Sequence, residues 1–263
     1  MIFLDKITKV FNQDTVDEIT AINNISLKIK KGDFITIIGS NGAGKTTLFN
    51  LIAGTYFPTY GTIYINNINV TKEPEYKRAK YIGRIFQNPL LGTASNMTLE
   101  DNMMICFKKG FKGIKISLNH KMRNFFKNHL KDLKMGLENR MKENVQLFSG
   151  GQRQALTLLM MVLSKPDLIL LDEHTAALDP KNAEIVLKLT TKFINEYKLT
   201  TIMITHNMSQ AIEYGNRILM MDKGEIILDI SDEEKKKLTV EKLVNKFHEL
   251  RHKELDTDEV LLS

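Results

Sequence analysis

Eight consecutive residues near the start of the chain have the types and spacing of a loop that binds phosphate groups. The pattern G-x-x-x-x-G-K-[ST] is matched at every required position by Gly39, Ser40, Asn41, Gly42, Ala43, Gly44, Lys45 and Thr46, and Thr47 extends the set. Glycines let backbone N–H groups curl around phosphate oxygens, and a helix starting beyond the loop adds partial positive charge. Lys45 is long enough to reach the outer phosphates, and the Thr46 hydroxyl can ligate Mg²⁺. The loop therefore predicts a polyphosphate site.

Two adjacent acids follow an apolar run later in the chain. Residues 168–171 read LILL, and Asp172 and Glu173 come directly after them. Because ligands gather at the carboxyl ends of strands in an open α/β sheet, Asp172 would reach the Mg²⁺, directly or through water. Glu173 would orient and polarise the attacking water as a general base. Alone, such a run is often only a strand that meets a polar turn, but the phosphate-binding loop favours the catalytic interpretation.

Small and polar residues open an apolar helix between these two motifs. Residues 149–154 read SGGQRQ, and the helix that follows carries Ala155, Leu156, Leu158, Leu159 and Met160. Exposed backbone N–H groups at a helix N-terminus form a second potential anion site. The same pattern alone could be only a helix cap.

The remaining sequence predicts the elements that position these motifs. A β-branched run at 34–38 predicts a buried strand before the loop, and the helix after it should span 44–54. Strand-like runs at 168–171 and 201–205 are separated by a helical pattern at 182–197. This strand–helix–strand order predicts a parallel α/β sheet.

Other segments predict flanking elements. Alternation predicts strands around Ile2–Ile7 and at 25–29 with a polar loop between, and hairpins are expected at 61–70 and 217–228. Residues 98–148 are rich in Met, Leu, Phe and Lys at helical spacing, which predicts an inserted helical subdomain. Ser231 should cap a final amphipathic helix through Phe247.

Length and composition limit the class of protein. The 263 residues, 43% hydrophobic and 26% charged, fit a globular protein and exclude wholesale disorder. The single cysteine, Cys106, cannot form an internal disulfide, and no apolar stretch approaches the length of a bilayer span. We therefore expect a soluble, intracellular protein that meets a membrane only through a partner.

The net charge of +6 is concentrated in one stretch. Nine lysines and arginines lie between Lys108 and Lys134, opposed only by Asp132. The ordinary interpretation is a solvated helical face. The alternatives are contact with an anionic membrane surface or with nucleic acid, and nucleic acid is the weaker because no reading motif accompanies the charge.

The motifs together resemble the ATPase subunit of ATP-binding cassette (ABC) transporters. The resemblance covers roughly residues 2–228 and rests on the order of 39–46, Gln87, 149–152, 172–173, 177–179 and His206. It implies an α/β P-loop NTPase (RecA-like) parallel-sheet core with an N-terminal antiparallel β subdomain and an inserted α-helical subdomain. The ATPase domain would span 1–228, with the core at 1–88 and 149–228, the helical subdomain at about 89–148 plus the signature helix, and a helical tail at 229–263.

The same resemblance implies how the site works. Two copies would pack head to tail and sandwich two ATP molecules, each between one P-loop and the partner's Ser149, Gly151 and Gln152. Gln87 would touch Mg²⁺ or water, His206 would contact the γ-phosphate, and Asp179 would lie across the dimer interface. Phe11 is the candidate that stacks on adenine. The implied catalytic set is Glu173, His206 and Gln87, and the implied metal set is Thr46, Gln87 and Asp172.

Three positions depart from the usual family pattern. Phe148 replaces the leucine before the signature, Phe11 stands where tyrosine is common, and His174 stands where many relatives have proline. His174 is either a second polar group near the nucleotide or only a loop residue, and we favour the loop residue. The run from His174 to Pro180 is similar to one bacterial importer-type subgroup, whose ATPases pair with a permease and a substrate-binding lipoprotein, some suspected of moving amino acids.

The leading hypothesis is a Mg²⁺-ATP hydrolase that dimerises on ATP and drives a separate membrane permease at the inner face of the cell membrane. Permease segments would dock near Gln87 and residues 90–98. The alternative is a soluble ABC ATPase acting on a cytosolic assembly or on nucleic acid. A third option is a nucleotide-binding regulator without turnover, against which Glu173 and His206 argue. The separate cassette favours import, and the expected cargo is a small solute such as an amino acid.

Overall fold

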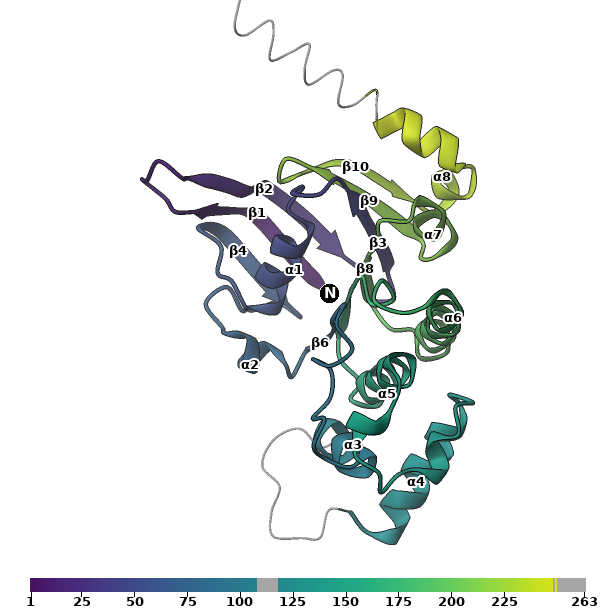
Figure 1. Cartoon of the computed structure of the whole chain (residues 1–263). Coiled ribbons are helices and arrows are strands. Elements are labelled where there is room, and N and C mark those ends of the chain that lie inside the picture. Colours follow the sequence, from purple (N-terminus) through teal and green to yellow (C-terminus); the bar gives the residue numbers. More distant parts are fainter. Residues whose placement is uncertain (108–117, 248, 250–263) are drawn as a thin grey trace, which may run out of the picture. The chain divides into compact units, whose positions relative to one another are not determined.

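The computed structural model describes residues 1–107, 118–247 and 249 of the 263-residue chain. The chain forms two compact units, one made of Met1–Lys72 with Ile202–Ser263 and the other of Glu73–Thr201 (Figure 1). The first unit is therefore built from both ends of the sequence.

An antiparallel sheet occupies the N-terminal part of the first unit. Its strands are β1 (Ile2–Phe11), β2 (Ile19–Ile29), β4 (Tyr60–Ile65) and β5 (Ile68–Asn69), in the order β2-β1-β4-β5. The prediction that the second strand starts at residue 25 is wrong. The β1–β2 ladder continues to the pair Phe11↔Ile19, so pairing extends the strand into the expected polar loop. The hairpin predicted at 61–70 is confirmed by the pairing of β4 with β5, and its turn residues Asn66 and Asn67 both adopt the positive φ that tight hairpins require.

The rest of the first unit contains β3 (Phe34–Gly39), β8 (Thr201–Ile204), β9 (Arg217–Asp222) and β10 (Glu225–Ser231), in the order β10-β9-β3-β8. Strand β3 pairs in parallel with β9, and β9 pairs antiparallel with β10. The helices are α1 (Lys45–Ala53), α7 (Met208–Glu213) and α8 (Asp232–Lys236). Helix α1 ends as predicted, because Gly54 takes the left-handed conformation that closes a helix.

The predicted continuous final helix is interrupted. Helix α8 ends at Lys236, the Ser231 side chain makes no capping bond, and helical structure resumes only at Val240. The Thr239 hydroxyl accepts from the backbone N–H of Lys242, which starts this second segment. Leu238 and Leu243 are nevertheless buried in one cluster with Ile38 and Ile218, as the apolar side of an amphipathic segment should be.

The second unit contains a parallel strand pair and most of the helices. Strand β6 (Ile82–Ile85) pairs with β7 (Leu168–Asp172). The helices are α2 (Glu75–Arg78), α3 (Leu99–Phe107), α4 (His120–Lys131), α5 (Gly150–Leu163) and α6 (Pro180–Tyr197), with 3₁₀ turns at Leu137–Asn139 and Val145–Leu147. Helix α6 begins two residues earlier than predicted, because Asp179 caps it and Pro180 suits its first turn.

Part of the basic stretch is visible in α4. This helix buries Phe126 and Leu130, and Phe126 and Phe125 pack with Phe107 of α3. Lys121, Lys127 and Lys131 are exposed. The first part of the stretch, residues 108–117, lies outside the described residues. Within the described ranges, no helix combines the length and apolar character needed to cross a membrane.

Candidate nucleotide-binding and catalytic site

The phosphate-binding loop lies between β3 and α1, as predicted. A Cβ on Gly39 would collide with the carbonyl oxygen of Met221, and one on Gly44 would lie 2.5 Å from that of Ala21. Both residues also have positive φ, so the chain turns here in a way that only glycine permits without strain. The loop is therefore built with its backbone close to neighbouring strands.

The Lys45 side chain curls back across this loop. Its Nζ donates to the carbonyl oxygens of Gly39 at 2.9 Å and Ser40 at 2.8 Å, and the residue is 5% exposed. The Ser40 hydroxyl donates to Asp222 at 2.7 Å, which fixes the loop's first turn. Thr46 is exposed and Thr47 is half-buried at the start of α1. The loop thus presents a positive charge, a helix N-terminus and a hydroxyl at one place.

Two more predicted site residues belong to the first unit. His206 is exposed directly after β8, and Asn207 caps α7 by accepting from the backbone N–H of Gln210. Phe11 ends β1 half-buried, with its ring edge-to-face against Tyr56 at 5.3 Å and the Lys9 Nζ 5.0 Å from its centroid. Their contacts with nucleotide remain predictions.

The signature residues begin α5 and are held by a reciprocal cap. The Ser149 hydroxyl oxygen accepts from the Gln152 backbone N–H at 3.2 Å, and the Gln152 side-chain oxygen accepts from the Ser149 backbone N–H at 3.1 Å. Each side chain uses an acceptor in the cap, which leaves the Ser149 O–H and the Gln152 NH₂ as donors. This start of α5 is a set of hydrogen-bond donors suited to an anion.

Glycines bring the start of α5 close to the loop that precedes α6 and to the first turn of α6. A Cβ on Gly151 would lie 2.8 Å from Asn182 Cγ, and one on Gly150 would lie 3.4 Å from Leu178. Asp179 accepts hydrogen bonds from the Asn182 side-chain amide and, as the cap of α6, from the Asn182 backbone N–H, and these bonds lower the pKa of Asp179. The signature therefore packs directly against the Asp179 loop.

Asp172 ends β7 in an ion pair that the sequence analysis did not predict. Its Oδ2 lies 3.2 Å from an Arg84 terminal nitrogen, and both side chains are mostly buried. The Arg84 guanidinium also lies over the Phe86 ring, 4.8 Å from its centroid. Gln87 is exposed one residue further on. The sequence signal that could have indicated this ion pair is Arg84 itself, a charged residue within the apolar run of β6.

The oxygen donors predicted for Mg²⁺ fit that ion. A threonine hydroxyl, a carboxamide and a carboxylate are hard ligands, and Mg²⁺ is commonly bound through one or two carboxylates plus substrate phosphates. Among the side chains that the structure describes, no group of three or more His, Cys, Asp or Glu gathers as a protein-only metal cage.

Glu173 and His174 form a tight turn after β7. Glu173 is half-buried with a φ of 46°, a left-handed conformation that is uncommon outside glycine. His174 is 2% exposed, and its Nε2 lies 3.1 Å from the Thr190 hydroxyl oxygen on α6. The His174 side chain is therefore buried between the turn and α6.

Burial lowers the pKa of His174 to about 4, against about 6.5 for an unperturbed histidine. Below pH 6.5 the unfolded chain binds a proton that the folded protein excludes, so stability present above pH 6.5 is lost as pH falls towards 4. The gap between the two pKa values corresponds to about 3 kcal/mol. Urea unfolding between pH 4 and 8, without nucleotide or metal, should show a steeper acid loss in wild type than in His174→Gln. His120→Gln, at an exposed position, should follow wild type; equal acid loss in all three proteins would contradict the prediction.

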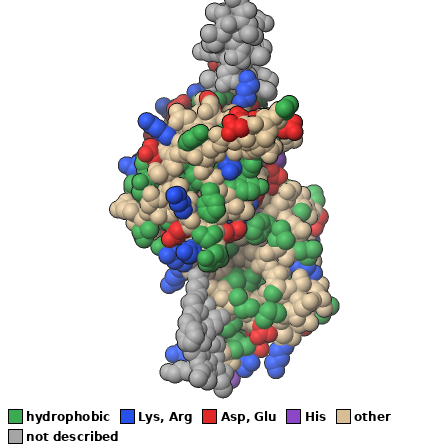
Figure 2. Space-filling view, turned by 90° about the vertical axis from the view of Figure 1, so that its left-hand side faces the viewer, with side chains coloured by type: hydrophobic (Ala, Val, Ile, Leu, Met, Phe, Trp, Pro, Cys, Tyr) green, Lys and Arg blue, Asp and Glu red, His purple; other side chains and the backbone are tan. Residues whose placement is uncertain are grey.

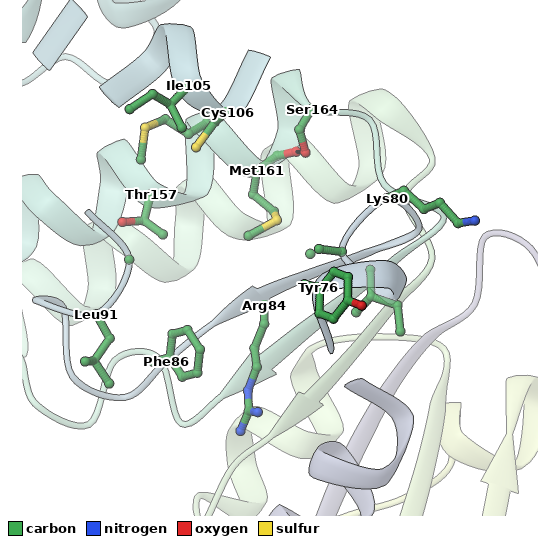
Figure 3. A pocket seen from close by; sticks show the side chains of 15 residues that line it. Tyr76, Lys80, Arg84, Phe86, Leu91, Ile105, Cys106, Thr157, Met161 and Ser164 are labelled. Carbon is green, nitrogen blue, oxygen red and sulfur yellow. Dashed lines mark hydrogen bonds between the residues drawn. The ribbon is translucent and has the colours of Figure 1, made fainter. Parts of the chain in front are cut away.

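A pocket of about 630 Å³ opens within the second unit (Figure 3). In Figure 3, Ile105 and Cys106 of α3 face Thr157 and Met161 of α5. Most of the lining is apolar, and it includes Ile82, Phe86, Leu91, Ile105, Met160 and Met161. Exposed apolar side chains at its edge are Tyr76, Leu91 and Ile105. The pocket lies beside Gln87, because Phe86 belongs to its lining.

The chain is similar to proteins of known class. Residues 22–176 match the family model described as ABC transporter. A tyrosine transport ATP-binding protein of Clostridioides difficile is 42% identical over 248 residues, with 94% of this chain and 98% of that protein covered. Methionine import ATP-binding protein MetN of Bacillus subtilis is 33% identical, with 91% of this chain and 70% of that protein covered. A solved dimeric ATP-binding cassette bound to ADP and phosphate has a TM-score of 0.72 and 28% identity, covering 88% of this chain and 98% of its own.

The phosphate-binding loop, the strand ending in Asp172 and the capped glycine helix define a P-loop ATPase. The family match and the relatives take the identification one step further. The chain belongs to the ABC transporter family, and it is an ATPase of that family. The predicted α/β fold class and ATP as the nucleotide are thereby confirmed.

Proposed function

We propose that this chain is the ATP-hydrolysing subunit of an importer for a small solute such as an amino acid. A separate membrane permease would be driven by ATP-dependent homodimerisation, and a substrate-binding lipoprotein would complete the system. The chain would sit at the inner face of the cell membrane, attached through the permease. The names of the relatives support this proposal, since they denote tyrosine transport and methionine import.

Each residue of the site has a proposed task. In one copy, 39–46 with Lys45 binds the phosphates, while Phe11 supports adenine. Thr46, Gln87 and Asp172 would hold Mg²⁺, and the bound ion would supply positive charge beside the phosphates. Glu173 accepts a proton from the attacking water, and His206 contacts the γ-phosphate.

The second copy completes the site. Ser149, Gly151 and Gln152 of that copy donate hydrogen bonds to the γ-phosphate, and Asp179 lines the interface. Because the γ-phosphate is contacted from both sides, its removal weakens the dimer. ATP hydrolysis would thereby open the dimer.

The pocket in the second unit is the observation that carries the permease assignment. Leu91 is 64% exposed and Tyr76 is 76% exposed, although both are large apolar residues lining one hollow. Figure 2 shows that hydrophobic side chains are interspersed with charged ones on the face it presents. An apolar pocket of this size beside Gln87 suits a short helix from a permease loop. Movement of that helix would reach the catalytic residues through Phe86 and Gln87.

Leu91→Asp should weaken permease binding by about 30-fold or more, because a carboxylate replaces an exposed apolar side chain that the docked helix would cover. Co-purification with a membrane protein from detergent extracts, followed by titration of the purified partner, measures the loss. Basal ATP hydrolysis should persist. Val16→Asp, at a fully exposed loop position of the other unit, serves as the matched control.

Recovery of a multi-span membrane protein by wild type and Val16→Asp, but not by Leu91→Asp, would support the proposal. Recovery of only soluble partners or nucleic acid would favour the alternative of a cytosolic ABC ATPase. A phosphate-release assay tests the remaining alternative of a regulator without turnover.

A further inference from the structure

Gln154 is a buried amide on α5, directly before the apolar run of that helix. It is 1% exposed and lies one turn beyond Ser149, among Ala155, Leu156 and Leu158, which are also buried. A buried amide is costly unless its polar atoms are bonded. Its Nε2 donates to two backbone carbonyl oxygens, that of Phe86 at 3.1 Å and that of His174 at 2.6 Å. Both N–H bonds of the amide are thereby used.

These two carbonyl groups belong to the loops that carry the proposed chemistry. Phe86 immediately precedes Gln87, and His174 immediately follows Glu173. One amide nitrogen therefore fastens both loops to the helix that begins with the signature. A displacement of either loop requires a bond to Gln154 to lengthen or break.

The Glu173 loop needs contacts with neighbouring elements to keep its conformation. Glu173 has a φ of 46°, and such a conformation persists only where surrounding structure determines it. The His174 ring provides a second attachment through Thr190. Since the Thr190 hydroxyl donates its proton to the Val186 carbonyl oxygen at 2.8 Å, it accepts from Nε2–H of His174. The residue after Glu173 is thus fixed to α5 by its backbone and to α6 by its side chain.

We propose that Gln154, with His174 and Thr190, forms a positioning clamp that aligns Glu173 and Gln87 with the signature helix for ATP hydrolysis. Gln154 is a positioning residue, because it acts through two loops. The proposal rests on the roles assigned above to Glu173 and Gln87. It also gives a physical path by which the start of α5 and the Gln87 loop influence the base in the same chain.

Gln154→Met tests the clamp, because methionine has a similar volume and no N–H donor. We expect kcat to fall about 10- to 100-fold through misplacement of the base. KM for ATP should change less than 2-fold, and the ATP-bound dimer should accumulate because its hydrolysis is slow. Hydrogen exchange should rise at the Ala176 amide, which donates to the Glu173 carbonyl oxygen in this turn. Gln146→Met, at an exposed position just before α5, is the control.

Thr190→Val provides a second test that leaves the bonds of Gln154 in place. It removes the partner of His174 together with the bond from the Thr190 hydroxyl to the Val186 carbonyl oxygen. We expect a smaller loss of kcat, about 3- to 10-fold, again with KM unchanged. If Gln154→Met fails to fold, Thr190→Val decides the question. Wild-type kcat and wild-type Ala176 exchange in a folded Gln154→Met protein would overturn the clamp and leave Gln154 as a core residue.

The proposed base is tested separately by Glu173→Gln. Turnover at the wild-type rate in that variant would remove the base assignment, whatever Gln154 does. An inactive Glu173→Gln protein together with a fully active Gln154→Met protein would reject the clamp alone.

Discussion

Glu173→Gln should lower ATP turnover by about 10²- to 10⁴-fold while ATP binding persists. The amide has nearly the same shape as the carboxylate but cannot take a proton from water. Because the γ-phosphate then remains in place, the variant should accumulate as an ATP-bound dimer. Phosphate release and size-exclusion chromatography in ATP measure the two effects.

Glu184→Gln is the matched control for this prediction. Glu184 is exposed on α6 and pairs with Lys188, away from the turn after β7. The Glu184→Gln protein should hydrolyse ATP at the wild-type rate and should not accumulate as an ATP-bound dimer. Wild-type hydrolysis in the Glu173 variant would assign the base to another group.

Lys45→Ala should weaken ATP binding by about 10- to 100-fold. A hydrogen bond from a charged donor contributes about 1.5–3 kcal/mol, and the ammonium is the positive side chain that the loop holds at its centre. Isothermal calorimetry with ATP measures the loss, and thermal unfolding checks that the fold persists. Lys28→Ala, at an exposed position of β2, should bind as wild type does. Unchanged affinity in the Lys45 variant would count against the loop as the phosphate site.

Local chemistry made much of the fold predictable. Residues 39–46 required a strand before them and a helix after them, and β3 and α1 have those positions. Gly54 and the Asn66-Asn67 turn ended their elements as their backbone preferences indicate. Errors arose where tertiary pairing decided the outcome. The ladder with β1 lengthened β2, and the Thr239 cap divided the final helix.

The candidate site was predictable where the motif itself carries the chemistry, as at Lys45, Ser149 and Glu173. Residues whose role depends on tertiary contacts with distant parts of the chain were not predictable. Arg84 is a single polar residue in an apolar run, and Gln154 is the last polar residue before one. The partner of Arg84 lies 88 residues away in sequence, and those of Gln154 lie 20 and 68 residues away. His174 was interpreted as a loop residue, but its side chain is an interior attachment. No spacing rule links residues that meet only when β6, β7 and α5 pack together.

The reciprocal cap of Ser149 and Gln152 also affects the entropic cost of associating two copies of the chain. A flexible serine or glutamine loses rotational freedom when it is ordered at an interface, and this loss opposes association. Here the rotamers are already fixed by the chain's own backbone, so most of that entropic cost falls on folding and little is left for the encounter. Closure of the dimer can then depend mainly on whether the bound nucleotide still carries its terminal phosphoryl group.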